Sequence, residues 1–281
     1  MSTSLTSTTQ AVRIPAITSA KLIAYREANL GFSGTVSQRY VDEAKVGSTI
    51  RWGLLNVRSA SSKSEGNSGN DITFAVDTPT AVTLTINQHQ YSAFEVEEFV
   101  EKLSIVDDED VETKNAMYAV NLAIDDTLAA LIDNADNAVG TLTIDLTDDD
   151  TRRGQQYLDD ADAPGDGRFF AMAPATKNSM LAINRYASSD FNRGGGANIV
   201  KGEFGDIYGF RTWVSTNVEG TNAAGHDNGM YHRDFFALAL RMAPRVRTFD
   251  DISNLSTQKA VSAIWGVTET RDDHGVFARG A

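Results

Sequence analysis

The alternation of apolar and polar side chains predicts β-strands in the first third of the chain. Apolar residues occupy every second position in three short runs: Ile50, Trp52 and Leu54, then Ile72, Phe74 and Val76, then Val82, Leu84 and Ile86. A period of two is typical of strands. Residues 59–70, "SASSKSEGNSGN", separate the first two runs with almost entirely polar side chains. We therefore expect the first two runs to pair as a long hairpin, which needs a further surface to lie on.

A long helix is predicted over residues 108–134. Its apolar residues step by 3, 4, 4 and 3 positions, which places them on one helix face; they are Met117, Val120, Ile124, Leu128 and Leu131. The acidic run at Asp107 to Asp110 supplies N-cap candidates and favourable charge at the positive end of the helix. The helix would be roughly 40 Å long at about 1.5 Å per residue.

The rest of the chain predicts shorter, mixed elements. We expect a strand over 141–147, a helix that breaks at Pro164, a buried strand over 168–174 and a helix over 175–187. The last of these would turn Met180, Leu181 and Ile183 inwards, and further strands surround Pro244. Residues 1–20 are mostly Ser, Thr and small residues and predict an extended arm. The order of elements indicates an α+β protein.

Composition narrows the function classes. The 281 residues suit one large domain or two that pack closely. The absence of cysteine excludes disulfides, thiolate metal sites and cysteine nucleophiles. No apolar run approaches the ~18 residues that a membrane helix needs, and the first residues lack a secretory pattern. We therefore expect no membrane partner and assembly in the cytoplasm.

Charge is distributed unevenly. The formal net charge is −13, which argues against a protein that coats DNA as a whole. Residues 1–40 nevertheless carry four cations and one acid, and residues 95–112 carry nine acids and one lysine. These two segments are expected either to attract each other between neighbouring copies or to be separate solvated surfaces.

The best candidate for enzymatic chemistry is the segment "GHDNGMYHRD", 225–234. Its potential metal ligands are His226, Asp227, His232 and Asp234. Their spacing fits no established metal motif, so we interpret the segment as a surface turn that leads into a strand. A metal-dependent hydrolase built on these residues remains the alternative from another class. We predict no catalytic, cofactor or metal site.

Two other stretches are interpreted as structural. The carboxylates Asp148 to Asp150 are assigned to a solvated surface, since adjacent acids diverge in direction. In "IVKGEFGDIYGF", 199–210, the glycines alternate with large aromatics that would fill a phosphate site. Gly202 and Gly205 fit a tight turn, and residues 207–215 would form a strand in which Gly209 permits a bulge or a close approach.

The order of features resembles the major capsid proteins of tailed bacteriophages, the Hong Kong 97-like fold. Four segments are similar to stretches of that family: "RFFAMAPATKNSML" (168–181), "IVKGEFGDIYGFRTWVSTNV" (199–218), "MYHRDFFALAL" (230–240) and "AIWGVTETRDDHGV" (263–276). The resemblance implies five regions: an N-terminal arm (1–40), an E-loop hairpin (41–86), a P domain with a spine helix (87–140), an A domain (141–229), and C-terminal strands shared by the P and A domains (230–281).

The resemblance also implies a structural function. The chain would self-assemble into pentamers and hexamers of an icosahedral head that encloses double-stranded DNA, with portal, scaffolding and decoration proteins as partners. Encapsulin-type nanocompartment shells share the fold and remain an alternative, although the basic arm favours a phage shell. Some family members cross-link a lysine of the E-loop, but the acceptor has no match here, so Lys63 is treated as an ordinary lysine.

Three sets of residues are expected at contacts between subunits. The set on the E-loop is Trp52, Arg58, Lys63, Glu65 and Phe74. The set on the arm is Arg13, Lys21 and Arg26. The acidic partner segment is Asp107, Asp108, Glu109, Asp110 and Glu112.

Overall fold

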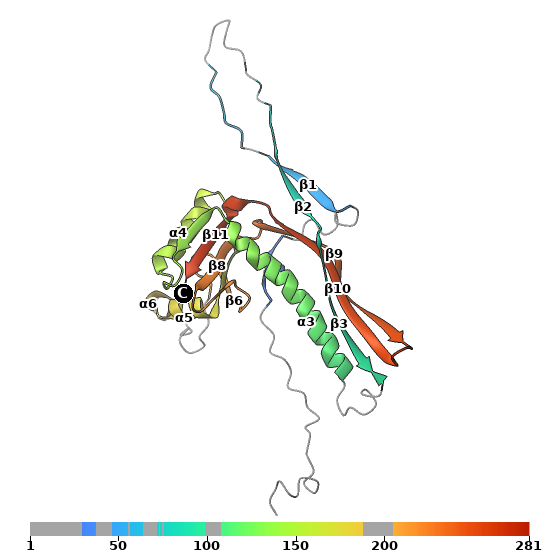
Figure 1. Cartoon of the computed structure of the whole chain (residues 1–281). Helices are drawn as coiled ribbons and strands as arrows, with labels where there is room; N and C mark the ends of the chain where they lie inside the picture. The colour runs from blue at the N-terminus through green and yellow to red at the C-terminus, as the bar shows by residue number, and fades with distance from the viewer. Residues whose placement is uncertain are drawn as a thin grey trace, which may run out of the picture.

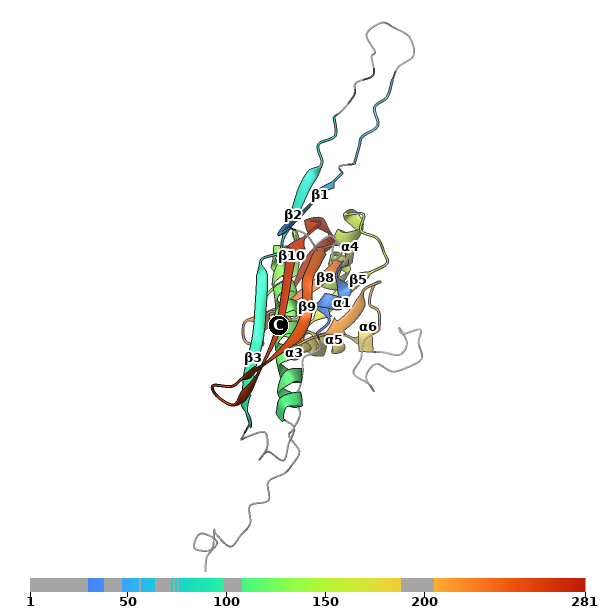
Figure 2. The same cartoon turned by 90° about the vertical axis from the view of Figure 1, so that its right-hand side faces the viewer.

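The computed structural model describes residues 30–37, 47–55, 57–63, 72, 74, 76–98, 108–187 and 205–280. These residues form a body with two sheets, from which a hairpin projects (Figures 1 and 2). Within the described part of the chain, no helix is long and apolar enough to cross a membrane.

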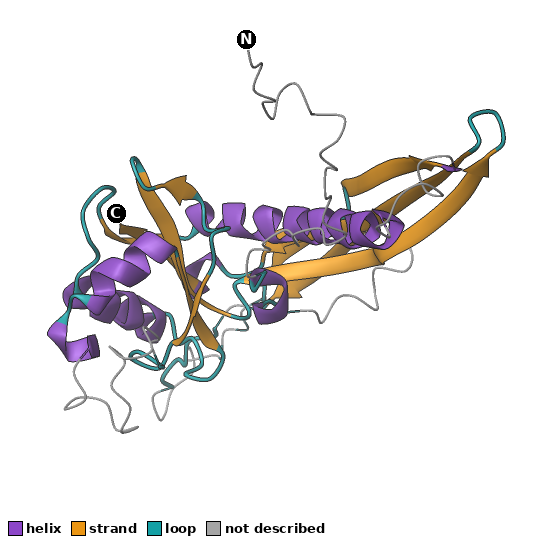
Figure 3. Ribbon diagram, turned by 90° about the horizontal axis from the view of Figure 1, so that it is seen from below, coloured by secondary structure: helices purple, strands orange, loops and turns teal. Residues whose placement is uncertain are grey.

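A three-stranded antiparallel sheet and a long helix form one half of the body. The sheet has the order β3 (Gln88–Glu97), β10 (Ser256–Glu269) and β9 (Phe236–Asp251). Helix α3 (Asp108–Ala129) lies along this sheet and continues as the 3-10 helix η2 (Ala130–Asn134) (Figure 3). The predicted helix over 108–134 is therefore confirmed, although its last turn is tighter than an α-helix.

The buried stripe of α3 and η2 differs from the predicted stripe at both ends. Its members follow at intervals of four residues: Ala116, Val120, Ile124, Leu128 and Ile132. Met117 is 38 % exposed and Leu131 is half-buried, so Ala116 and Ile132 take their expected places. Residues at i and i+4 lie above one another on a helix, which explains the continuous stripe.

A six-stranded sheet forms the other half of the body. Its main path is β4 (Asn137–Gly140), β11 (Gly275–Gly280), β8 (Gly225–His232), β5 (Arg168–Met172) and β6 (Arg211–Val214), with β7 (Gly220–Thr221) beside β8. One face packs against α4 (Asp148–Asp160) and α5 (Pro174–Leu181), which is followed by the short α6 (Asn184–Ala187). The other face joins the core beneath α3. The expected end of the A domain at residue 229 lies inside β8. Strand β4 belongs to this sheet as well, although its residues 137–140 were assigned to the P domain.

Residues 30–37 correct the prediction for the arm. Residues 1–40 were assigned to an N-terminal arm, yet α1 (Phe32–Thr35) lies against the body and buries Phe32 completely. The Phe32 ring packs edge-on against Trp213 with centroids 4.6 Å apart. Its backbone neighbour Ser33 donates its N–H to the buried carboxylate of Asp125 on α3 at 3.1 Å. A single large aromatic side chain thus fixes this part of the segment to the body.

The predicted strand over 141–147 is wrong. The chain turns after Gly140, which has a positive φ of 73° and lies so close to Arg279 that a Cβ atom would come 2.2 Å from its carbonyl oxygen. The amide of Ile144 then donates to the carbonyl oxygen of Thr141 at 3.2 Å, which closes the turn. Ile144 is 60 % exposed, so the alternating pattern here does not mark a buried strand face.

A tight turn also replaces the first part of the strand predicted over 207–215. Tyr208 and Gly209 both have positive φ, and Ile207 and Phe210 exchange backbone hydrogen bonds at 3.0 and 2.8 Å. Strand β6 begins only at Arg211. Gly209 therefore serves a two-residue turn rather than a bulge within the strand. Gly202 lies outside the described residues.

The hairpin pairs differently from the prediction. Strand β1 (Thr49–Leu54) pairs with β2 (Thr80–Thr85), which contains part of the third apolar run. Ile72, Phe74 and Val76, the predicted partners, are not in a strand. The third run is favoured because Leu84 is buried together with Ile50 against two alanines of β9.

Strand β9 contains Pro244 and two irregularities. Two register shifts interrupt its pairing with β10. The first lies between Arg245 and Met242 of β9, and the second lies between Met242 and Leu240. Each shift leaves one extra residue on β9, as in a β-bulge. Pro244 lies at the first bulge, and β9 is the outer strand of the sheet, which is where proline is tolerated.

Candidate assembly surfaces

The root of the hairpin is fixed to the body by a small apolar cluster. Ile50 and Leu84 are buried against Ala237 and Ala239 of β9, and Trp52 packs at the edge of this cluster. The hairpin also crosses β10 at Gly266, where a Cβ atom would lie 2.4 Å from the carbonyl oxygen of Thr85. The root is therefore a rigid attachment. Trp52, expected at a contact between subunits, lies half-buried in this root.

Beyond the root the hairpin carries exposed apolar side chains. The exposed fractions are 74 % for Leu55, 100 % for Val57, 64 % for Ile72, 88 % for Phe74 and 88 % for Val76. A run of exposed apolar side chains on a projecting segment is unusual for a monomeric protein. The hairpin is thus the clearest candidate for a surface that another molecule covers.

The charged residues of the hairpin lie in different settings. Arg58 forms an ion pair with Asp77 of the same hairpin at 3.8 Å, although its side chain remains 70 % exposed. Lys63 is exposed and is the last residue of the described segment 57–63, and Glu65 lies outside the described residues. An acid on another subunit would therefore have to compete with Asp77 for Arg58.

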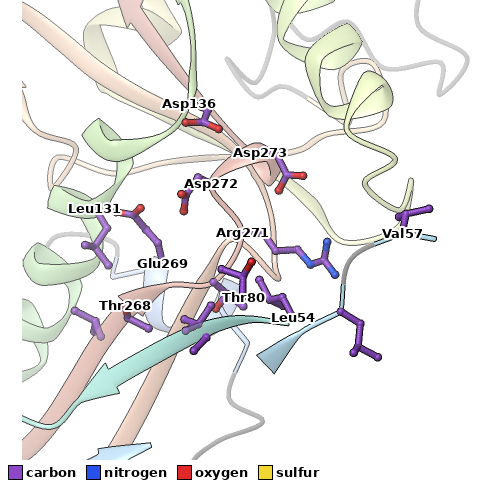
Figure 4. Close-up of a pocket in the computed structure, with 15 residues that line it drawn as sticks. Leu54, Val57, Thr80, Leu131, Asp136, Thr268, Glu269, Arg271, Asp272 and Asp273 are labelled. Carbon is purple, nitrogen blue, oxygen red and sulfur yellow. The ribbon is translucent and has the colours of Figure 1, made fainter. Parts of the chain in front are cut away.

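A groove lies between the hairpin root and the connection from β10 to β11. Its volume is about 760 Å³, and Leu54, Leu55, Val57 and Thr80 line its hairpin side (Figure 4). Its body side carries four acids and one arginine: Asp136, Glu269, Asp272, Asp273 and Arg271. We call this feature the root groove. It combines an apolar wall with an acidic wall.

The acids of the root groove are crowded. Burial raises the pKa of Glu269, a hydrogen bond to Asn134 opposes this shift, and the charges of Asp272 and Asp136 raise the pKa further. Carboxylates that repel one another in this way are stabilised by a cationic neighbour. The root groove therefore suits a positively charged segment.

The outer face of the three-stranded sheet is a second exposed surface. Tyr91 on β3 is 72 % exposed and Phe249 on β9 is 68 % exposed. A hollow of about 400 Å³ beside Phe249 is lined in part by Ala93, Ala260 and Arg247. The opposite face packs against α3, so this outer face is the side of the sheet without a covering helix (Figure 3).

The acidic segment at the start of α3 lies at the opposite end of the body from the hairpin (Figure 1). Asp110 forms an ion pair with Lys114 at 3.3 Å within the helix, and Glu112 is exposed. Helix α3 begins at Asp108, followed by Glu109, and Asp107 lies outside the described residues. Arg13, Lys21 and Arg26 of the arm also lie outside them.

The surface turn predicted over 225–234 is wrong for residues 225–232; only the last two residues turn, and they lead into β9. Residues 225–232 form β8, which lies between β11 and β5 inside the six-stranded sheet. His226 and His232 are buried, and a separation of six residues on an extended strand places them about 20 Å apart. The two histidines therefore cannot bind one ion. Among the described residues, no group of three or more His, Cys, Asp or Glu side chains is arranged to hold a metal.

Asp148 has a structural role that the sequence did not reveal. Its carboxylate accepts hydrogen bonds from the hydroxyls of Tyr186 at 2.6 Å and Tyr208 at 2.7 Å, and it pairs with Arg185. Burial alone would raise the pKa of Asp148, but these two hydrogen bonds and the charges of Arg185 and Arg152 outweigh it and lower the pKa. The prediction of a merely solvated acid is therefore wrong for Asp148, which ties α4 to α6 and to the turn before β6.

Comparison with known proteins identifies the fold. No family model and no curated protein matches the sequence. Among solved structures, a chain from Mycobacterium phage Che8 has a TM-score of 0.83 and 20 % identity, over 94 % of this chain and 96 % of that one. The capsid structure of cyanophage P-SCSP1u gives a TM-score of 0.79 and 12 % identity, over 97 % and 94 %. The mature capsid of bacteriophage PhiM1 gives 0.72 and 14 %, over 95 % and 91 %. The predicted α+β class is confirmed, and the chain has the Hong Kong 97-like fold of phage capsid proteins.

Proposed function

We propose that this chain is the major capsid protein of a tailed phage. It assembles in the host cytoplasm into pentamers and hexamers, which form an icosahedral head around double-stranded DNA. The observation that carries the proposal is the projecting hairpin with its exposed apolar side chains, on a fold that solved phage capsids share. Exposure of these apolar side chains to water is unfavourable, and a neighbour that covers them lowers the free energy.

The hairpin acts as a clasp between subunits. Leu55, Val57, Phe74 and Val76 supply apolar area at the contact, and Arg58 and Lys63 supply charge. The receiving surface is the outer sheet face around Tyr91 and Phe249 on a neighbour, which offers matching aromatic area. Exposed ion pairs at the rim of such a contact contribute only about 0–1 kcal/mol each, so apolar contact dominates the affinity.

The basic arm provides a second contact. Arg13, Lys21 and Arg26 bring positive charge, and the root groove of a neighbour offers Asp136, Glu269, Asp272 and Asp273. The acids at the start of α3 are the other candidate, but Asp110 already has Lys114 as a partner there. We place the arm in the root groove, where four acids lie beside a single arginine, Arg271.

The overall charge suits a shell around DNA. With a net charge of −13, the chain offers no excess of cations that would hold packaged DNA against the wall. Portal, scaffolding and decoration proteins are the expected partners of such a shell. An encapsulin-type nanocompartment is the remaining alternative with the same fold, and its interior would hold protein cargo in place of DNA.

Expression of the full chain followed by size-exclusion chromatography and electron microscopy tests the proposal. Closed shells with five- and six-fold subunit clusters would support it. A protein that remains monomeric or stops at a small oligomer, in the presence of phage scaffolding functions, would overturn it. Nuclease-resistant DNA in particles from infected cells distinguishes a phage head from a protein compartment.

A further inference from the structure

Two of the three connections between the two sheets carry a buried histidine; the third runs from β3 through α3 and η2 to β4. Strand β8 ends at His232, and the following turn leads into β9 of the three-stranded sheet. The chain returns from β10 through the 3-10 helix η3 (Asp272–His274) into β11. His232 is 3 % exposed and His274 is 5 % exposed. Their rings meet edge to face with centroids 5.7 Å apart, so the two connections touch through their imidazoles.

Hydrogen bonds hold His232 in its neutral form. Its Nδ1 atom accepts from the backbone N–H of Asp234 at 3.2 Å. Nδ1 is therefore the unprotonated nitrogen, and Nε2–H donates to the carbonyl oxygen of Asp166 at 3.0 Å. A second proton would have to bind at Nδ1, where it would displace the Asp234 amide. Protonation of His232 thus breaks a bond inside the turn that joins the sheets.

The charged groups around the pair do not remove this penalty. Asp234 and Asp273 approach the two rings at 3.9 and 4.0 Å and are partly exposed to water. The buried Arg168 of β5 faces His232, and Arg271 faces His274.

The charge of Arg168 is already balanced. It pairs with Asp159 of α4 at 2.6 Å and donates to the carbonyl oxygens of Pro164 and Ala163. Burial is the largest influence on both imidazoles, and it lowers the pKa of His232 and of His274. Two further positive charges would therefore be poorly accommodated here.

We propose that His232 and His274 form a proton-sensitive latch between the two sheets of the subunit. With both rings neutral, the latch holds the β8–β9 turn against η3. When the rings are protonated, their mutual repulsion and the loss of the Asp234 hydrogen bond loosen the joint, so the two halves of the body move more freely. The latch is a property of the folded subunit and does not depend on the proposed shell function.

The direction of the pH effect follows from linkage. Because the folded pKa values lie below the ordinary histidine value, the unfolded chain binds protons more readily than the folded one. The latch is therefore fully formed above pH 6.5 and weakens as the pH falls through that value towards the folded pKa values. Each unit by which a pKa is lowered corresponds to about a tenfold change in the equilibrium.

The pH dependence of hydrogen exchange in the full chain tests the latch. We expect the protection factors of the Asp234 and Phe235 amides to fall about tenfold or more between pH 7.5 and pH 5. The double variant H232Q/H274F should lose this dependence, because Phe keeps a ring at residue 274 and neither residue titrates. The variant H89Q is the matched control, since His89 is exposed on β3, and it should behave as wild type. Equal pH dependence in wild type and in the double variant would overturn the latch.

A measurement on the wild-type chain covers the case in which the double variant fails to fold. NMR of the histidine side chains between pH 8 and pH 4 gives the titration curve of each of the four histidines. The latch requires that the titrations of His232 and His274 both lie below pH 6.5 and are coupled. Titration of either His232 or His274 at or above pH 6.5 would rule it out.

Discussion

Replacing Phe74 by alanine should weaken assembly and leave the folded subunit intact. Phe74 is 88 % exposed in the single chain, so truncation removes almost no contact with its own body. An aromatic side chain buries about 150–250 Å² when it is covered, and the lower end of this range is worth about 4 kcal/mol at ~25 cal/mol per Å². If a neighbour covers half of that area, the loss is about 2 kcal/mol per contact. This corresponds to about a thirtyfold weaker association constant between two subunits.

The assay compares assembly with subunit stability in the same preparations. Shell yield at graded subunit concentrations, read by sedimentation and electron microscopy, should shift to higher concentration for F74A. Chemical unfolding of unassembled subunits should change by no more than about 0.5 kcal/mol, as for other surface changes. The matched control is I144A, which removes a 60 % exposed apolar side chain outside the hairpin and should leave the yield unchanged. Wild-type assembly of F74A would refute the clasp.

Three further variants test contacts within the subunit. D148N should destabilise the fold by about 1–2 kcal/mol at neutral pH, because the charge that accepts the two tyrosine hydrogen bonds is lost. Since the folded pKa of Asp148 is lowered, the difference in stability from wild type should fade as the pH falls below the ordinary carboxyl value of 3.8. The control D149N changes an exposed neighbour and should have little effect in the same urea titrations. G266A should lower the free energy of unfolding by about 1–3 kcal/mol, because the added methyl group would clash with the Thr85 carbonyl oxygen. Limited proteolysis should then cut the hairpin root faster, and unchanged cleavage would contradict the close crossing. L128A should cost about 2–5 kcal/mol in calorimetry or denaturant unfolding, and a loss below 1 kcal/mol would contradict its place in the core.

The elements with one strongly buried face were readable from the sequence. Helix α3 was predicted closely because Val120, Ile124 and Leu128 keep a helical spacing over several turns. The buried strand β5 was also confirmed. The alternating residues around Ile144 show the limit of this signal, because a turn that places apolar residues in solvent can have the same period as a strand.

The errors at the candidate surfaces have tertiary causes. Phe32 belongs to a segment without apolar periodicity, and only the space beside Trp213 and Tyr231 makes it a core residue. The partners of Asp148 come from 38 and 60 residues further along the chain, which no local pattern can indicate. His232 looked like a turn residue because polar neighbours surround it, yet its strand is central in a sheet.

The edge of β9 has a consequence for how copies of this chain meet. An outer strand offers unpaired backbone groups to any other strand, and at high concentrations of the chain such edges would join into continuous ribbons. Pro244 removes one donor from this edge, the two bulges interrupt its straight run, and Arg241, Arg245 and Arg247 place repelling charges along it. Backbone-to-backbone fusion is thereby disfavoured, and subunits are left to associate through side chains. Side-chain contacts dissociate more readily than a shared ladder of hydrogen bonds, so in the shell proposed above a misplaced subunit would be able to leave and rebind before closure.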